Sequence, residues 1–319
     1  MILTVTAHAA LDRVIMIPTF QPEGRIIASS STDYVGGKGF DVSVALSGLG
    51  VDNLAMGILA GENGRRLEFL LHGYGVEHDL TWVSGETRIA HVIVEADLHR
   101  HTHIMTPSYQ VAVEDVQRFL SHFRSRVWEA DWVVASGSLA EGIPVNFYAE
   151  LLEIAHQAGV RTLIDCFGEP ARQCLAARPD ILKQNTHEFV STFQLDEQIA
   201  TNLPELLDAI TAVRTRFDLP AVVITRGKSG ILAVTPKGTF QAYCQPVNAV
   251  SAAGAGDTVS ATLSWRLGLG DSWQETLRWS AAAGAAGALT AGTGEVHLED
   301  VLRLLPQVVI ERISEPDSG

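Results

Sequence analysis

Short apolar runs alternate along most of the chain with longer segments in which apolar residues return every three or four positions. The short runs are typical of buried strands, and the longer segments, such as 146–159 and 205–217, are typical of helices that bury one face. Strands that alternate with helices form a mostly parallel sheet covered on both faces. We therefore predict a three-layer α/β/α core. Its strands are expected at 2–7, 54–59, 132–136, 161–165, 221–225 and 230–234.

Two stretches, 13–35 and 87–106, break this rhythm because strand patterns follow one another there without helices between them. They predict a small separate β-sheet built from the runs 13–18, 25–31, 91–96 and 99–105. The expected organisation is an α/β core over 1–12, 36–86 and 107–313, a second sheet over 13–35 and 87–106, and a loose tail at 314–319.

Ala252 to Asp257 form a run of small residues that ends in a carboxylate and precedes a segment able to continue as a helix. The glycines allow a ligand to approach the chain, and the free amides of a first helical turn bind anions. We predict an anion hole at Gly254, Ala255 and Gly256. A carboxylate beside a bound anion fits proton removal from an incoming hydroxyl, so Asp257 is the candidate base. A tight packed turn, with Asp257 as a helix N-cap, is the structural alternative.

A second glycine cluster, Gly36 to Gly39, also opens a helical pattern. It is not a phosphate-binding Walker A loop, because Gly39 and not Ser or Thr follows Lys38. Together the segments 35–50 and 251–261 resemble the two signature regions of the ribokinase-like, or PfkB, carbohydrate kinase family. The start of the chain resembles the branch that contains phosphofructokinases and tagatose-phosphate kinases. Further similar segments lie at 85–88, 136–144, 183–188, 225–230 and 290–294.

This resemblance implies a ribokinase-like fold, with the small sheet as a lid over the substrate that often also makes a homodimer contact. It implies phosphoryl transfer from ATP, with Asp257 accepting the proton of the acceptor hydroxyl. Asn185 and Glu188 are similar to the family element that organises Mg²⁺, expected here to act through water because this ion keeps much of its hydration shell. The residues implied to bind nucleotide are Lys183, Thr225, Gly227 and Gly230.

On the acceptor side, Asp12 can bind sugar hydroxyls through both carboxylate oxygens, and the backbone at Gly37 can pack against the sugar ring. Lys38 and Arg88 are the candidate cations for a phosphate already present on the sugar; a solvated turn lysine and an ordinary strand-face charge are the alternatives. Ser138 is expected to line the same cleft.

Three departures from the family pattern put the acceptor in question, one of them the segment 102–105, which replaces a more acidic or amide-rich lid segment of the family. His8, Ala9 and Ala10 stand where the branch has Asn-Pro-Ala, and Asp41 stands where it has asparagine. An asparagine amide donates and accepts hydrogen bonds, whereas an ionised aspartate only accepts them and adds a negative charge near the sugar. We expect Asp41 to belong to the substrate-binding set.

Composition narrows the class of protein. The chain has 319 residues, 46% of them apolar, and a formal net charge of −14. This charge argues against nucleic-acid or membrane-surface partners, which are polyanions, while a small phosphate ester can still be held by local cations. The absence of a signal-peptide pattern leads us to expect a cytoplasmic protein. Three cysteines without metal-ligand spacing are expected to be buried free thiols, and the histidine-rich run 99–103 is expected to be a solvated strand face and not a metal site.

Three functions remain open from the sequence. The leading hypothesis is an ATP-dependent kinase of a ketose phosphate such as fructose 1-phosphate, fructose 6-phosphate or tagatose 6-phosphate. The second is a kinase of an unphosphorylated sugar or polyol, for which Asp41 would bind a further hydroxyl. The third is a sensor of sugar or nucleotide that keeps the fold without turnover, against which the presence of Asp257 argues.

Overall fold

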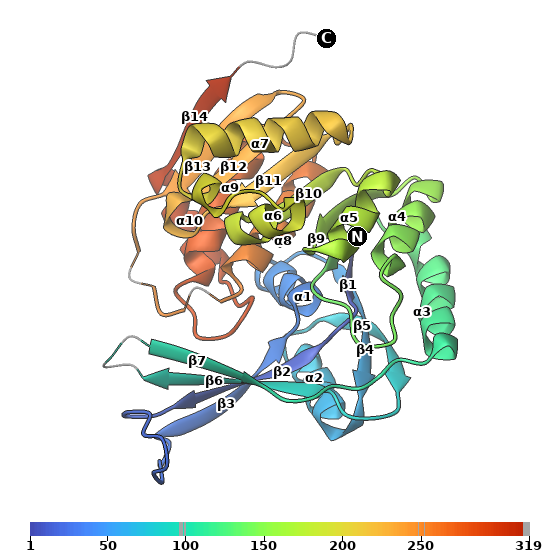
Figure 1. Cartoon of the computed structure of the whole chain (residues 1–319), viewed down its shortest axis with the longest axis vertical. Coiled ribbons are helices and arrows are strands. Elements are labelled where there is room, and N and C mark those ends of the chain that lie inside the picture. The colour runs from blue at the N-terminus through green and yellow to red at the C-terminus, as the bar shows by residue number, and fades with distance from the viewer. Residues whose placement is uncertain (96–97, 99, 248, 252, 315–319) are drawn as a thin grey trace.

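The computed structural model describes residues 1–95, 98, 100–247, 249–251 and 253–314. In this part of the chain a central sheet of ten strands has the order β14-β13-β12-β11-β10-β9-β8-β1-β4-β5 (Figure 1). The strands from β11 to β5 in this order run parallel, and β12, β13 and β14 add an antiparallel edge. The prediction of a mostly parallel sheet is confirmed. The strands are β1 Ile2–Thr6, β4 Asn53–Ala60, β5 Glu77–Val83, β8 Trp132–Ser136, β9 Arg161–Asp165, β10 Ile181–Asn185, β11 Ala221–Thr225, β12 Ile231–Thr235, β13 Gly238–Cys244 and β14 Val308–Ser314.

Helices cover both faces of this sheet, because side chains of one strand alternate between two apolar clusters. Leu3 and Val5 of β1 pack into the cluster that includes α3, α4 and α7, whereas Ile2 packs into the cluster that includes α1, α8 and α9. Both faces are therefore dry, which explains the nearly continuous apolar strand sequences. The helices are α1 Lys38–Gly48, α2 Gly61–Gly73, α3 Val113–Arg126, α4 Phe147–Gln157, α5 Glu169–Cys174, α6 Thr186–Phe193, α7 Leu203–Arg216, α8 Ala255–Gly268, α9 Trp273–Gly287 and α10 Leu298–Leu304.

A four-stranded sheet of order β3-β2-β6-β7 projects from the body (Figure 1). Its strands are β2 Ala10–Met16, β3 Ser30–Gly36, β6 Arg88–Glu95 and β7 Arg100–Met105. The predicted small sheet is present, but the strand expected at 25–31 begins only at Ser30. β3 pairs with β2 from Gly36 back to Ser30, opposite Met16, and Pro18 lies just beyond. Because proline has no backbone N–H, it does not extend the ladder past this point.

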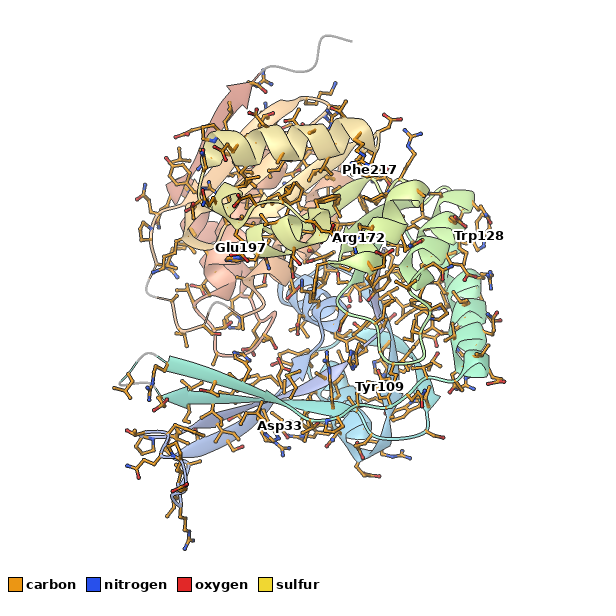
Figure 2. The ribbon with its side chains drawn as sticks, in the orientation of Figure 1. Asp33, Tyr109, Trp128, Arg172, Glu197 and Phe217 are labelled. Carbon is orange, nitrogen blue, oxygen red and sulfur yellow. The ribbon has the colours of Figure 1, made fainter. Side chains whose placement is uncertain are left out.

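The small sheet is joined to the core by packing and by charge. Leu11 of β2 and Val35 of β3 are buried against Phe40 of α1 in a third apolar cluster. Asp33, which Figure 2 shows on the small sheet, accepts from Arg13 on the neighbouring strand at 2.7 Å and from Arg66 of α2 at 3.3 Å. These contacts fix the base of the sheet, where Asp12 lies, relative to the first turn of α1.

Two simpler expectations can also be compared with the structure. Cys166 and Cys174 are buried free thiols, as predicted, and Cys244 is free and partly buried. Among the described residues, no helix has the length and apolar content needed to cross a bilayer. The predicted tail beyond Ser314 and His99 of the histidine-rich run lie outside the described residues.

Candidate active site at the carboxyl ends of the strands

Polar residues end several neighbouring strands at the same edge of the central sheet. Thr6 of β1 lies opposite Ser136 of β8, and Ser136 lies opposite Asp165 of β9. Asn185 of β10 lies opposite Thr225 of β11. Because these strands are parallel, their carboxyl ends form one row, which is where open α/β sheets bind ligands. Helices α1, α6 and α8 bring their first turns to the same row.

Asp165 is the most connected group in this row, and sequence reasoning did not identify it. Its Oδ2 accepts from Nζ of Lys183 at 2.6 Å and from Oγ of Ser260 at 3.1 Å, and its Oδ1 accepts from Nζ of Lys38 at 3.0 Å. Burial alone would raise the pKa of Asp165, but the two ammonium groups outweigh burial and hold the pKa at about 2. The one available signal was its position as the polar end of an apolar strand run.

Lys38 connects the two halves of the site. Besides Asp165, its ammonium donates to Oε1 of Glu188 at 2.7 Å. Burial would lower the pKa of Lys38, yet Asp165, Asp257 and Glu188 together raise it. The sequence predicted Lys38 as a cation for a sugar phosphate. In the structure the ammonium group of Lys38 is already paired with the carboxylates of Asp165 and Glu188. It lies near the carboxyl ends of β9 and β10.

Asn185 and Glu188 form the capping box that starts α6. Oδ1 of Asn185 accepts from the Glu188 amide, and Oε2 of Glu188 accepts from the Asn185 amide, each at 2.9 Å. Within the described residues, no group of three histidine, cysteine, aspartate or glutamate side chains is arranged to hold a metal ion directly. The carboxylate still has lone pairs beyond its two donors, so the pair fits contact with a hydrated cation through water.

Asp257 occupies the first turn of α8 and is buried. Its Oδ1 has no hydrogen-bond partner among the described residues. Burial and the charge of Asp165 raise its pKa to about 7, and Lys38 and Lys183 limit the rise. A general base works best with a pKa near the operating pH, so this carboxylate suits proton acceptance in neutral solution.

Only one of the two glycines in the predicted anion hole has a backbone conformation that requires glycine. Gly254 is the N-cap of α8 with φ 77°, and a Cβ there would lie 2.1 Å from the amide nitrogen of Gly294. Gly256 has ordinary helical backbone, and a Cβ on it would lie 3.1 Å from Nζ of Lys183. The amide of Asp257 donates to the carbonyl of Gly254 at 3.0 Å. Among the described residues, the amides of Ala255 and Gly256 in this first turn have no backbone partner and remain for an anion.

Asp12 and Asp41 lie together on the small-sheet side of the site. Oγ1 of Thr293, in the glycine turn before α10, is 3.2 Å from Oδ2 of Asp12 and also faces Asp41. Burial raises the pKa of Asp12 to about 7, against the opposing effects of Thr293 and Arg88. Burial, Asp257 and Asp12 raise the pKa of Asp41 well above its ordinary value. Burial and the neighbouring acids therefore disfavour the negative charge that the sequence leads us to expect at Asp41.

The substituted His8 also belongs to the site. Its Nδ1 lies 3.1 Å from Oγ of Ser138, and burial together with Arg88 lowers its pKa to about 4, so the ring is neutral. Arg88 donates to the carbonyls of His8 and Ala9 at 3.2 and 3.4 Å. Tyr109, on the segment that returns from the small sheet to the core (Figure 2), meets the His8 ring edge to face, with 6.2 Å between the ring centroids. The structure thus brings the predicted Ser138 and Arg88 together around His8, for which the sequence analysis predicted no role.

The predicted nucleotide residues divide into two groups. Lys183 is buried and held by Asp165, as described above. Thr225 ends β11, and the loop that follows contains Gly227 with φ 54° and Gly230 with φ 82°. A Cβ at Gly230 would lie 2.1 Å from the carbonyl oxygen of Ala242, whereas a Cβ at Gly227 would meet no atom within 4 Å. Gly227 is therefore needed for its dihedral angle alone, and Gly230 also for close packing on β13.

Known proteins share this architecture and sequence pattern. The family model of pfkB family carbohydrate kinases matches residues 3–300, and the chain belongs to this family. Phosphofructokinase-2 from Escherichia coli, solved with fructose-6-phosphate, has 23% identity and a TM-score of 0.85 over 96% of this chain and 98% of its own. A possible 1-phosphofructokinase from Thermotoga maritima has 23% identity and a TM-score of 0.87 over 98% and 99%. Ribokinase from Arabidopsis thaliana, solved with ribose and ATP, has 22% identity and a TM-score of 0.76 over 95% and 98%.

The family match makes the protein a carbohydrate kinase, a class that implies the use of ATP. The likeness to solved structures shows that the fold is the ribokinase-like one predicted from the sequence.

Proposed function

We propose that the protein transfers the terminal phosphoryl group of ATP to a hydroxyl group of a ketose phosphate, of the fructose 1-phosphate, fructose 6-phosphate or tagatose 6-phosphate type. The observation that carries the reaction is the buried carboxyl group of Asp257, with its free Oδ1 and a pKa raised to about 7, at the start of α8. The acceptor class is supported by the similar phosphofructokinases from two bacteria.

In the proposed reaction the acceptor hydroxyl oxygen forms a bond to the terminal phosphorus, and the bond between this phosphorus and the leaving ADP oxygen breaks. The hydroxyl proton passes to Asp257. The amides of Ala255 and Gly256 stabilise charge on the transferring group, and Lys183 and Lys38 place positive charge at the strand ends. Asn185 and Glu188 would hold a hydrated Mg²⁺, which neutralises phosphate oxygens when bound.

A second acceptor class is favoured by a specific observation. The two candidate phosphate-binding cations are already engaged, Lys38 by Asp165 and Glu188, and Arg88 by two backbone carbonyls. An unphosphorylated sugar or polyol would require no free cation at this place. The similar ribokinase shows that the same fold is found with a free sugar.

A coupled assay of ADP release tests both classes. Wild-type protein and Asp257→Asn are measured with ATP and Mg²⁺ against matched pairs of free and phosphorylated ketoses. Turnover confined to the esters supports the first proposal, and turnover confined to the free sugars replaces it with the second. If no acceptor raises ADP release above that of the Asp257→Asn control, the reaction itself is wrong for this chain and the sensor hypothesis takes its place.

The same family resemblance leads us to propose a homodimer formed through the small sheet. Ile104 and Met105 of β7 and Ile27 near β3 are large apolar side chains that are 46%, 48% and 74% exposed. A second copy of the sheet could cover them.

A further inference from the structure

Three carboxyl groups from three different elements meet on the acceptor side of the site. Asp12 comes from β2, Asp41 from the first turn of α1 and Asp257 from the first turn of α8. Asp41 is 5% exposed, and its Oδ1 has no hydrogen-bond partner among the described residues. The backbone of Gly294 presses on the same residue, since a Cβ there would lie 2.4 Å from the Asp41 carbonyl oxygen. The glycine turn therefore packs closely against the backbone of Asp41.

The groups that face Asp41 offer little compensation for a negative charge. Asp12 and Asp257 are like charges, and Thr293 offers a hydroxyl. Tyr74, at the end of α2, interacts with Asp41 and donates its own proton to Glu295. The cation is Lys38 on the same helix, which Asp165 and Glu188 already engage. A buried carboxylate without its own counter-ion is strongly disfavoured, and protonation removes that cost.

The hydrogen bonds available to Thr293 also bear on the protonation of the neighbouring acids. Its Oγ1 lies 2.6 Å from the carbonyl oxygen of Val35 and 3.2 Å from Oδ2 of Asp12. A hydroxyl has one proton, and a carbonyl oxygen can only accept, so the closer contact to Val35 takes it. The same hydroxyl is then a weak donor to Asp12 and Asp41, so it offsets only part of the effect of burial on their pKa values.

We propose that Asp41 is protonated in the resting protein and that its carboxyl group donates and accepts hydrogen bonds with a hydroxyl group of the acceptor. A neutral carboxyl group has the same pair of functions as the carboxamide that the family pattern places there. This makes Asp41 a specificity-determining residue for an uncharged, hydroxyl-bearing part of the acceptor. A phosphate or carboxylate group of the acceptor is excluded from this position, because it would meet three acidic groups. The binding role rests on the proposed function, whereas the protonation does not.

The protonation is tested without any ligand by the pH dependence of unfolding. An aspartate in an unfolded chain ionises with a pKa of about 3.9. Between that value and the raised pKa of Asp41, the folded protein binds one more proton than the unfolded chain, so this group lowers stability as the pH rises. Urea unfolding of wild type, Asp41→Asn and the exposed helix variant Asp208→Asn is measured from pH 5 to pH 8.

We expect the unfolding equilibrium constant of wild type, relative to Asp41→Asn, to grow by about tenfold per pH unit from pH 5 up to the raised pKa of Asp41. Asp208→Asn should run parallel to wild type. Parallel curves for wild type and Asp41→Asn would overturn the proposal. If Asp41→Asn does not fold, carbon-13 NMR of wild type with assigned aspartate carboxyl resonances decides: the resonance assigned to Asp41 should not titrate near pH 4, and its titration there would overturn the proposal.

Kinetics test the binding role. Above the pKa of Asp41 the ionised group loses its donor, and kcat/KM of wild type should fall by up to about tenfold per pH unit. On the alkaline side of the pH profile, kcat/KM should fall less for Asp41→Asn, which keeps its donor, than for wild type. Identical alkaline limbs for the two proteins overturn the binding role. If no acceptor is turned over at all, the proposed function fails while the result of the unfolding experiment stands.

Discussion

Nζ of Lys183 donates to Oδ2 of Asp165 over 2.6 Å, and the two side chains are 3% and 0% exposed. Lys38 and Ser260 complete the surroundings of the same carboxylate. One aspartate at the end of β9 therefore orients a lysine from β10, a lysine from α1 and a serine from α8. The two lysines that supply positive charge to the site therefore share one buried counter-ion.

Replacing Asp165 by asparagine should destabilise the protein strongly. The substitution leaves the buried ammonium of Lys183 without a counter-charge, and removal of one partner from a buried ion pair costs about 3–5 kcal/mol. Urea unfolding at pH 7 measures the loss. The control is Glu150→Gln, which breaks an exposed pair with Arg124 and should cost less than about 1 kcal/mol. Equal losses in the two variants would show that Asp165 is not the centre of the network.

Asp257→Asn should lower kcat by a factor on the order of 10² to 10⁴ while ATP binding persists, because the amide keeps the shape but cannot take the proton. Steady-state turnover and equilibrium nucleotide binding separate the two effects. The exposed variant Asp208→Asn is the control and should behave as wild type. Near-normal turnover in Asp257→Asn would remove this residue from its proposed role.

The rate should depend on pH through the same carboxyl group. Asp257 accepts a proton only when ionised, and its pKa is raised to about 7. We therefore expect kcat/KM to rise as the pH increases through about 7, and to fall by about tenfold per unit below it. Asp165, with a pKa of about 2, contributes nothing in this range. A profile that is flat from pH 5 to pH 8 would contradict the assignment.

Gly254→Ala should destabilise the protein far more than Gly75→Ala, although the two glycines have similar φ angles. At Gly254 the new Cβ would strain a backbone with φ 77° and would also lie 2.1 Å from the amide nitrogen of Gly294. At Gly75, with φ 71°, a Cβ meets no atom within 4 Å, so only the strain of about 1–2 kcal/mol remains. Thermal or urea unfolding of both variants gives the difference. We expect Gly254→Ala to lose turnover as well, because the displaced turn carries Thr293. Similar losses in both variants would argue against close packing of the two glycine turns.

The proposed dimer predicts that a charge on the small sheet separates the subunits. Ile104→Glu places a carboxylate on an exposed apolar position of β7. Sedimentation of wild type should give twice the mass of one chain, and that of Ile104→Glu the mass of one chain. As a control, Leu302→Glu alters an equally exposed leucine of α10 and should leave the mass unchanged. A wild type that sediments as a single chain would rule the dimer out.

The sequence by itself predicted the layers of the core and most of the residues that gather at the candidate site. Alternating strand and helix patterns predicted the parallel sheet, because periodicity reports which faces are buried. The two glycine clusters and the 183–188 segment located Asp257, Lys38, Lys183 and Glu188, because these residues lie within short motifs. Short motifs of this kind can be recognised in the sequence without knowledge of the fold.

The tertiary structure alone decided what these residues contact and in which direction their pKa values shift. Asp165 meets Lys38 across 127 positions of the chain, and Thr293 meets Asp12 across 281. The sequence treated Lys38 as free for a phosphate and Asp41 as ionised. Packing places the carboxylates of Asp165 and Glu188 beside Lys38. It also shields Asp41 from water next to Asp12 and Asp257. The pKa of a group depends on burial and on charges within a few ångströms, and both are set by elements far apart in the sequence.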